Sequence, residues 1–168
     1  MEPLVMEPVP AANQYVLPAG FWKRFLAYII DGVILWIVSV ILFVPLLGLI
    51  GLGALGSYDL QDLNSSMGLV IALISGYLVT ILAIIIAGWL YYALMESSSK
   101  GATLGKMALG LRVTDMFGNR ISFARASGRY FGKILSGLIF YIGFIMAGFT
   151  QQKQALHDIL AGCLVVSK

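Results

Sequence analysis

The most informative stretch of this sequence is residues 25–49, which read FLAYIIDGVILWIVSVILFVPLLGL. Asp31 is the only charged residue in that stretch. A helix needs roughly 20 mostly apolar residues to cross a hydrocarbon core about 30 Å thick. Residues 25–49 are therefore predicted to form a transmembrane helix.

Two further stretches lack charged residues. Positions 63–95 contain no Asp, Glu, Lys or Arg, which predicts a second spanning helix over residues 69–95. Positions 134–152 are also uncharged, but this stretch is shorter and contains several glycines. We expect a third apolar segment over residues 131–149. It either crosses the membrane as a short tilted helix or turns back as a re-entrant pair of half-helices.

The composition of the whole chain agrees with a membrane protein. Hydrophobic residues make up 60% of the 168 positions, charged residues make up 11%, and the mean hydropathy is +0.92. Soluble domains have roughly 25% charged residues, and a soluble fold of this size cannot bury so much apolar surface. The expected fold class is an all-α membrane bundle of two long helices and a third short or re-entrant segment. We expect residues 1–20 to be an extended or disordered tail and residues 21–168 to form one membrane domain.

The distribution of positive charge predicts the orientation. Residues 96–133 carry seven Lys or Arg residues against two acidic ones, whereas residues 50–68 carry only two Asp residues. Cytoplasmic loops are enriched in Lys and Arg, so residues 96–130 and the N-terminus are expected in the cytoplasm. Exposed cations in this loop are predicted to anchor it to anionic lipid headgroups, at about 1 kcal/mol each. These cations are Lys100, Lys106, Arg125 and Arg129.

The cytoplasmic loop also contains strand signals. Residues 111–115 alternate apolar and polar side chains, and the turn residues Gly118 and Asn119 follow. With residues 120–122 they predict a small β-hairpin. The β-prone residues 164–166 offer another partner for residues 111–113, provided that the tail lies on the cytoplasmic side.

An acidic residue inside a spanning helix requires a physical explanation. Asp31 costs roughly 2.5–3.5 kcal/mol in the membrane unless it is paired, hydrated or protonated. Arg24 precedes it by nearly two helical turns, so both side chains share one face, with Tyr28 between them. A second isolated carboxylate, Asp158, stands beside His157 near the C-terminus. It can approach Arg24 and Asp31 only if the third apolar segment turns back.

Several classes of function are not expected. The single cysteine, Cys163, excludes an intramolecular disulfide and a multi-cysteine metal cluster. Cys163 and His157 do not form a credible catalytic pair, and residues 101–107 lack the spacing of a phosphate-binding loop. The positive net charge is explained by membrane topology, so nucleic-acid binding is not expected. We predict no enzyme activity, no metal and no cofactor.

Three motifs together resemble the RDD family of bacterial membrane proteins. They are FWKRFLAYIID at residues 21–31, TLGKMALGLRV at residues 103–113, and LHD at 156–158 followed by LAG at 160–162. By position, the arginine and two aspartates that give the family its name correspond to Arg24, Asp31 and Asp158. The resemblance implies a multi-pass protein of the bacterial inner, or plasma, membrane.

Two functions are expected to compete. In the first, Arg24, Asp31 and Asp158 form a buried network that fixes the packing of a small scaffold, assembly or lipid-interacting protein. In the second, Asp31 exchanges a proton for a sodium ion in a transporter, as proposed for a few members of the resembled family. The transporter would have to be a homo-oligomer or bind a partner subunit, because three apolar segments do not easily enclose a pathway.

Overall fold

The computed structural model describes residues 17–56, 63–139 and 142–167. Of the tail expected over residues 1–20, only residues 17–20 are therefore described. The helices are α1 (Phe21–Gly56), α2 (Leu63–Ser97), α3 (Leu104–Ala108), α4 (Phe123–Leu138), α5 (Ile142–Ile145), the 3-10 helix η1 (Met146–Gly148) and α6 (Leu156–Leu160), and the strands are β1 (Leu111–Asp115) and β2 (Cys163–Ser167).

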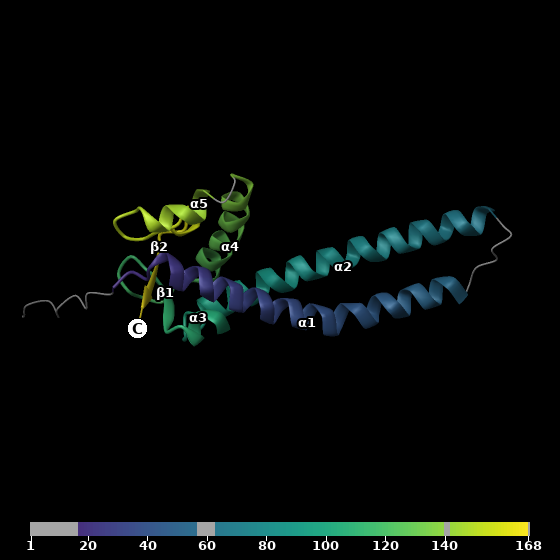
Figure 1. The fold of residues 1–168 in the computed structure, drawn as a ribbon, viewed down its shortest axis with the longest axis horizontal. Coiled ribbons are helices and arrows are strands. Elements are labelled where there is room, and N and C mark those ends of the chain that lie inside the picture. Colours follow the sequence, from purple (N-terminus) through teal and green to yellow (C-terminus); the bar gives the residue numbers. More distant parts are fainter. Residues whose placement is uncertain (1–16, 57–62, 140–141, 168) are drawn as a thin grey trace, which may run out of the picture.

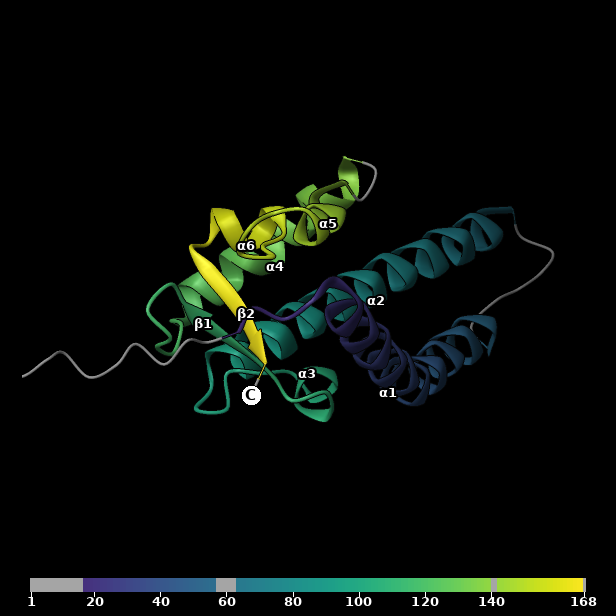
Figure 2. The ribbon, with the colours of Figure 1, turned by 60° about the vertical axis from the view of Figure 1, so that its left-hand side comes forward.

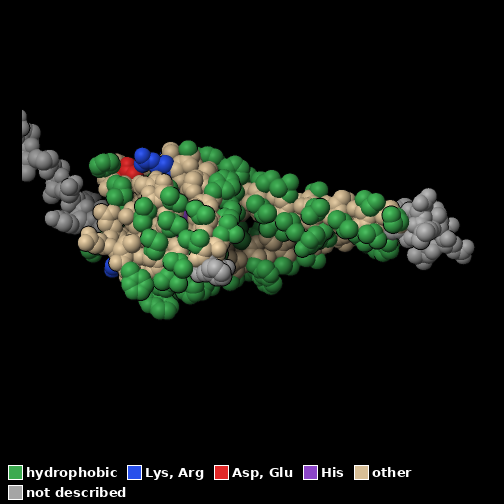
Figure 3. Space-filling model, turned by 90° about the horizontal axis from the view of Figure 1, so that it is seen from above, with side chains coloured by type: hydrophobic (Ala, Val, Ile, Leu, Met, Phe, Trp, Pro, Cys, Tyr) green, Lys and Arg blue, Asp and Glu red, His purple; other side chains and the backbone are tan. Residues whose placement is uncertain are grey.

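Two long apolar helices dominate the molecule, as predicted. α1 and α2 are long and apolar enough to cross a membrane over Phe21–Gly53 and Met67–Ser97. They run side by side and project from a compact cap, residues 98–139 and 142–167, which lies where α1 begins and α2 ends (Figure 1). Most large apolar side chains on both helices are exposed, and hydrophobic side chains cover them in the face shown in Figure 3. Such a surface is suited to lipid rather than water.

The third apolar segment turns back. α4 and the α5–η1 pair are bent by 117° relative to each other, with residues 140–141 outside the described part. α5 and α6 pack back against α4, so this part of the chain does not follow α1 and α2 to their far ends (Figure 1). The segment expected over residues 131–149 is therefore bent and does not form one straight tilted helix.

The only strand pairing among the described residues joins the loop to the tail. β1 and β2 are antiparallel, with Leu111 opposite Ser167 and Val113 opposite Val165. The predicted pairing of residues 111–113 with 164–166 is therefore confirmed. Figure 2 shows the two paired strands below α4 and α6.

The prediction of a hairpin within residues 111–122 is correct for the first strand and the turn, but wrong for residues 120–122 as the second strand. The turn after β1 forms, and Asp115 Oδ1 accepts hydrogen bonds from the backbone nitrogens of Phe117 and Asn119. Residues 120–122 form no strand. β2 adds two buried side chains, Cys163 and Val165, to the core beside β1, whereas residues 120–122 add only Ile121, which reaches that core without forming a strand.

Small side chains allow the long helices to pack closely against the cap. Ala27 of α1 and Ala93 of α2 are completely buried, and both belong to one core cluster with Leu111, Val113 and Val165. Residues 18–20 join the same unit: Pro18 forms a bridge with Val166, and Ala19 N donates a hydrogen bond to the carbonyl of Val165 at 2.9 Å. The start of α1, the end of α2 and the cap thus form one folded body.

Candidate functional site: a buried charge network beside a cavity

Asp158 at the start of α6 is held by two arginines from distant parts of the chain. Its side chain is fully buried, and Oδ2 lies 2.5 Å from Nη1 of Arg24 on α1. Oδ1 lies 2.7 Å from Nη2 of Arg129 on α4. The backbone nitrogen of Ala155 also donates to Oδ2 at 3.3 Å. Burial alone would raise the pKa of Asp158, but the nearby positive charges, that of Arg129 above all, outweigh burial and lower the pKa to about 2. This carboxyl group is therefore ionised at neutral pH.

Glu96 at the end of α2 forms a second anionic centre. Lys106 Nζ of α3 donates to Oε1, Arg129 Nη1 lies 3.1 Å from Oε2, and Lys133 Nζ lies 3.6 Å from Oε1. Arg129 therefore bridges Glu96 and Asp158. We call these six residues the charge network, and they contribute four cations and two carboxylates: Arg24, Lys106, Arg129, Lys133, Glu96 and Asp158.

Asp31 is buried apart from this network and has uncharged partners. Its carboxylate accepts hydrogen bonds from Tyr91 Oη at 2.8 Å, Thr103 Oγ1 at 2.5 Å and Gly105 N at 2.7 Å. The expected pairing with Arg24 is not made. Arg24 instead bonds to Asp158 and donates to the carbonyls of residues 19 and 165. Gly105 of α3 and Thr103, the N-cap residue just before it, supply two of these donors and thereby hold α3 against α1.

The backbone of α3 lies so close to that of α1 that position 105 must be glycine. A Cβ atom built on Gly105 would lie 2.4 Å from the Ala27 carbonyl oxygen and 2.9 Å from Asp31 Cγ. Only glycine lets this backbone N–H reach the carboxylate. Gly132 of α4 has a similar role, because a Cβ atom there would lie 3.0 Å from that of His157.

His157 and Tyr28 lie on opposite sides of a shared space. His157 is buried, and its burial lowers the pKa to about 3 despite the nearby Asp158. The imidazole is therefore neutral, and its Nδ1 atom has no hydrogen-bond partner within the described residues. Tyr28 is half exposed, and its ring centroid lies 6.3 Å from that of Phe144.

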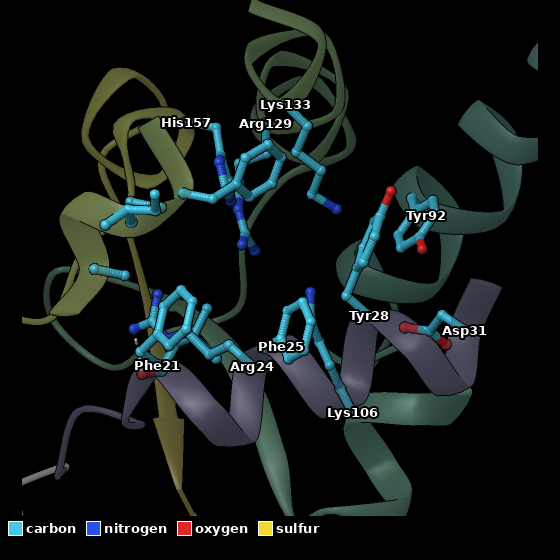
Figure 4. A pocket seen from close by; sticks show the side chains of 15 residues that line it. Phe21, Arg24, Phe25, Tyr28, Asp31, Tyr92, Lys106, Arg129, Lys133 and His157 are labelled. Carbon is cyan, nitrogen blue, oxygen red and sulfur yellow. Dashed lines mark hydrogen bonds between the residues drawn. The ribbon is translucent and has the colours of Figure 1, made fainter. Parts of the chain in front are cut away.

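That space is a cavity of about 290 Å³ between α1 and the α4–α6 region. Figure 4 shows Lys106, Arg129 and Lys133 pointing toward its centre from α3 and α4, with aromatic rings of α1 along one side. The residues that line it are Phe21, Arg24, Phe25, Tyr28, Asp31, Tyr92, Lys106, Arg129, Lys133, Phe144, Ile145, Ala147, Ala155, His157 and Val165.

Two of the four predicted headgroup anchors are placed differently. Lys106 is 8% exposed and Arg129 is 1% exposed, and both are bonded to Glu96. This corrects the expectation that they anchor the loop at the surface, because a buried cation needs a partner inside the protein. Lys100 and Arg125 are exposed, and headgroup anchoring by these two remains a prediction.

The sequence analysis missed Glu96 and Lys133 as site residues. A signal for Lys133 was available, because it stands four positions after Arg129 and therefore on the same face of α4. Ser122 caps that helix by accepting a hydrogen bond from Arg125 N at 3.3 Å. Glu96 gave no comparable signal, since a single acid at the end of an apolar stretch is also typical of a solvated helix end.

These contacts define a class of protein: a helical membrane protein whose spanning helices are tied to a cap by buried ion pairs. Among the described residues, no group of three or more His, Cys, Asp or Glu side chains is placed to hold a metal ion.

The chain belongs to the RDD family, which matches it over residues 18–162. It is 43% identical to the uncharacterized protein YxaI of Bacillus subtilis (strain 168), over 90% of this chain and 98% of that protein. It is 32% identical to the uncharacterized membrane protein YteJ of the same organism, over 88% of this chain and 80% of YteJ. No solved structure matches the chain.

Proposed function

We propose that this chain is a lipid-interacting membrane scaffold that acts without catalysis. In this proposal the two spanning helices cross the bacterial plasma membrane, and the charge network fixes the cap against its cytoplasmic surface. The excess of Lys and Arg in residues 96–133 supports a cytoplasmic cap and N-terminus.

The observation that carries the proposal is the composition of the cavity wall. One side is apolar and partly exposed, with Phe25 46%, Tyr28 54% and Ile145 48% exposed. The same wall holds the four cations of the charge network and Asp31. A wall that is apolar at its mouth and cationic inside matches an amphiphile better than a water-soluble metabolite.

Obstruction of the cavity mouth tests this function. Native mass spectrometry of the full chain in detergent is expected to detect a bound phospholipid, and Ile145→Trp should weaken that binding severalfold by filling the mouth. Ile142→Trp is the matched control, because Ile142 is exposed on the same helix but does not line the cavity. If no lipid is retained by the wild type, or if both variants lose lipid equally, the proposal is wrong.

Cation–proton exchange through Asp31 is the second candidate. It is favoured by the neutral surroundings of this carboxylate, which is fully buried in a spanning helix, borders the cavity and pairs with no cation of the charge network. Such a group can exchange a proton for a sodium ion, provided that further subunits complete a pathway. Vesicles holding the wild type should then show sodium-driven proton flux that Asp31→Asn abolishes. Absence of flux in the wild type would exclude this function.

A further inference from the structure

We propose that the cavity binds the phosphate-bearing headgroup of an anionic phospholipid, whose acyl chains leave through the apolar mouth between α1 and α5. This inference rests on the proposed lipid interaction and specifies its ligand. It places the site between the start of α1 and the cap, among the cations of the charge network, and not on the exposed cations of the loop.

The charge balance of the network favours an anionic guest. Arg129, Lys106 and Lys133 all converge on the single carboxylate of Glu96. Asp158 balances only Arg24 and the other side of Arg129. All four cations line the cavity against one carboxylate, that of Asp31, whereas Glu96 and Asp158 do not line it. Like charges held this close repel one another in a poorly solvated site, so a further negative charge in the cavity would stabilise the cluster.

Two buried nitrogen atoms at the cavity have no hydrogen-bond partner in the described part of the chain. They are Nε of Arg129 and Nδ1 of His157, in residues that are 1% and 6% exposed. A buried polar atom without a partner costs about 1–3 kcal/mol. Phosphate oxygens are strong acceptors, and arginine is the side chain best suited to bind them. A headgroup phosphate in the cavity would offer an acceptor to Arg129 Nε, and to His157 Nδ1 in the neutral tautomer that carries its proton on that atom.

The size and shape of the cavity suit a headgroup rather than a whole lipid. Its volume of about 290 Å³ is at the lower end of ligand cavities, roughly 300–1,000 Å³. The acyl chains would have to lie outside, along Phe25 and Tyr28 of α1 and Ile145 of α5, which are exposed apolar side chains at the mouth. Lys133 is already oriented toward the cavity, since its Nζ lies 3.9 Å from the ring centroid of Tyr92.

The test compares three dioleoyl lipids that differ only in the headgroup, and inorganic phosphate as the free ion. The full chain in detergent is titrated with dioleoyl phosphatidylglycerol, dioleoyl phosphatidylcholine, dioleoylglycerol and inorganic phosphate, and binding is measured by native mass spectrometry. Lys133→Gln removes one cavity cation, and Arg125→Gln removes one exposed cation from the same helix. Lys133→Arg keeps the charge and controls for folding.

The expected result is tighter binding of phosphatidylglycerol than of phosphatidylcholine, with no uptake of dioleoylglycerol. Lys133→Gln should weaken phosphatidylglycerol binding about fivefold, while Arg125→Gln should leave it unchanged and Lys133→Arg should retain it. Equal binding of the two phospholipids would overturn this inference yet leave the lipid-interacting function intact, whereas absence of any lipid adduct would overturn both. Equal losses in Lys133→Gln and Arg125→Gln, or in Lys133→Gln and Lys133→Arg, would also overturn it. Displacement of the lipid by equimolar inorganic phosphate would identify the free ion as the ligand.

Discussion

Asp158 makes the contacts that tie the tail to the first spanning helix and to α4. Asp158→Asn leaves Arg24 and Arg129 buried beside an uncharged amide, and breaking a buried pair in this way costs about 3–5 kcal/mol. We expect a correspondingly large fall in the free energy of unfolding, measured by chemical denaturation in detergent. Arg24→Gln/Asp158→Asn should cost less than the sum of its two single substitutions, because the double variant leaves fewer uncompensated charges. Arg125→Gln, on the exposed side of α4, should stay within about 0.5 kcal/mol of the wild type. Strict additivity of the two single effects would contradict the direct coupling between Arg24 and Asp158.

At the scale of elements, the contact between α3 and α1 depends on Gly105, which has no side chain. Gly105→Ala places a Cβ atom against the Ala27 carbonyl and Asp31, so α3 must move and its hydrogen bond to the carboxylate must lengthen. We expect a loss of about 1–3 kcal/mol, the usual cost of overpacking, seen as a lower Tm. Gly128→Ala is the control, because nothing lies within 4 Å of a Cβ atom there, and alanine in a helix is favoured by about 0.5–1 kcal/mol. A Gly105→Ala variant as stable as Gly128→Ala would show that α3 does not press against α1 in this way.

The whole molecule should lose stability in mild acid. Burial lowers the pKa of His157 from 6.5 to about 3 in the folded protein, so between these values the unfolded chain binds more protons and stability rises with pH. The contribution of neutral His157 is complete above pH 6.5 and falls as the pH drops toward 3. Asp158, whose folded pKa is about 2, adds a second loss that begins only below about pH 4. Thermal unfolding in detergent should therefore give a Tm that falls from pH 7 to pH 4.5 in the wild type and stays nearly level in His157→Gln. An equal slope in both proteins would assign the acid sensitivity to another group.

The sequence alone determined the membrane class and the two long helices, and it offered residues 164–166 as one of two partners for residues 111–113. These follow from charge-free length and from alternation, which are properties of local sequence. It also singled out Arg24, Asp31 and Asp158, because an isolated charge in an apolar stretch is conspicuous.

Only the tertiary structure decided how these charges are partnered. Arg24 bonds to Asp158 and not to Asp31, since the folded-back third segment brings α6 to the start of α1. Asp31 takes its donors from α2 and α3, where Gly105 permits close approach. Lys106 and Arg129 were predicted to be surface cations, but both are buried in ion pairs with Glu96. Helical spacing relates residues on one helix, whereas contacts between helices depend on packing and on the angle between α4 and α5, which the sequence does not fix.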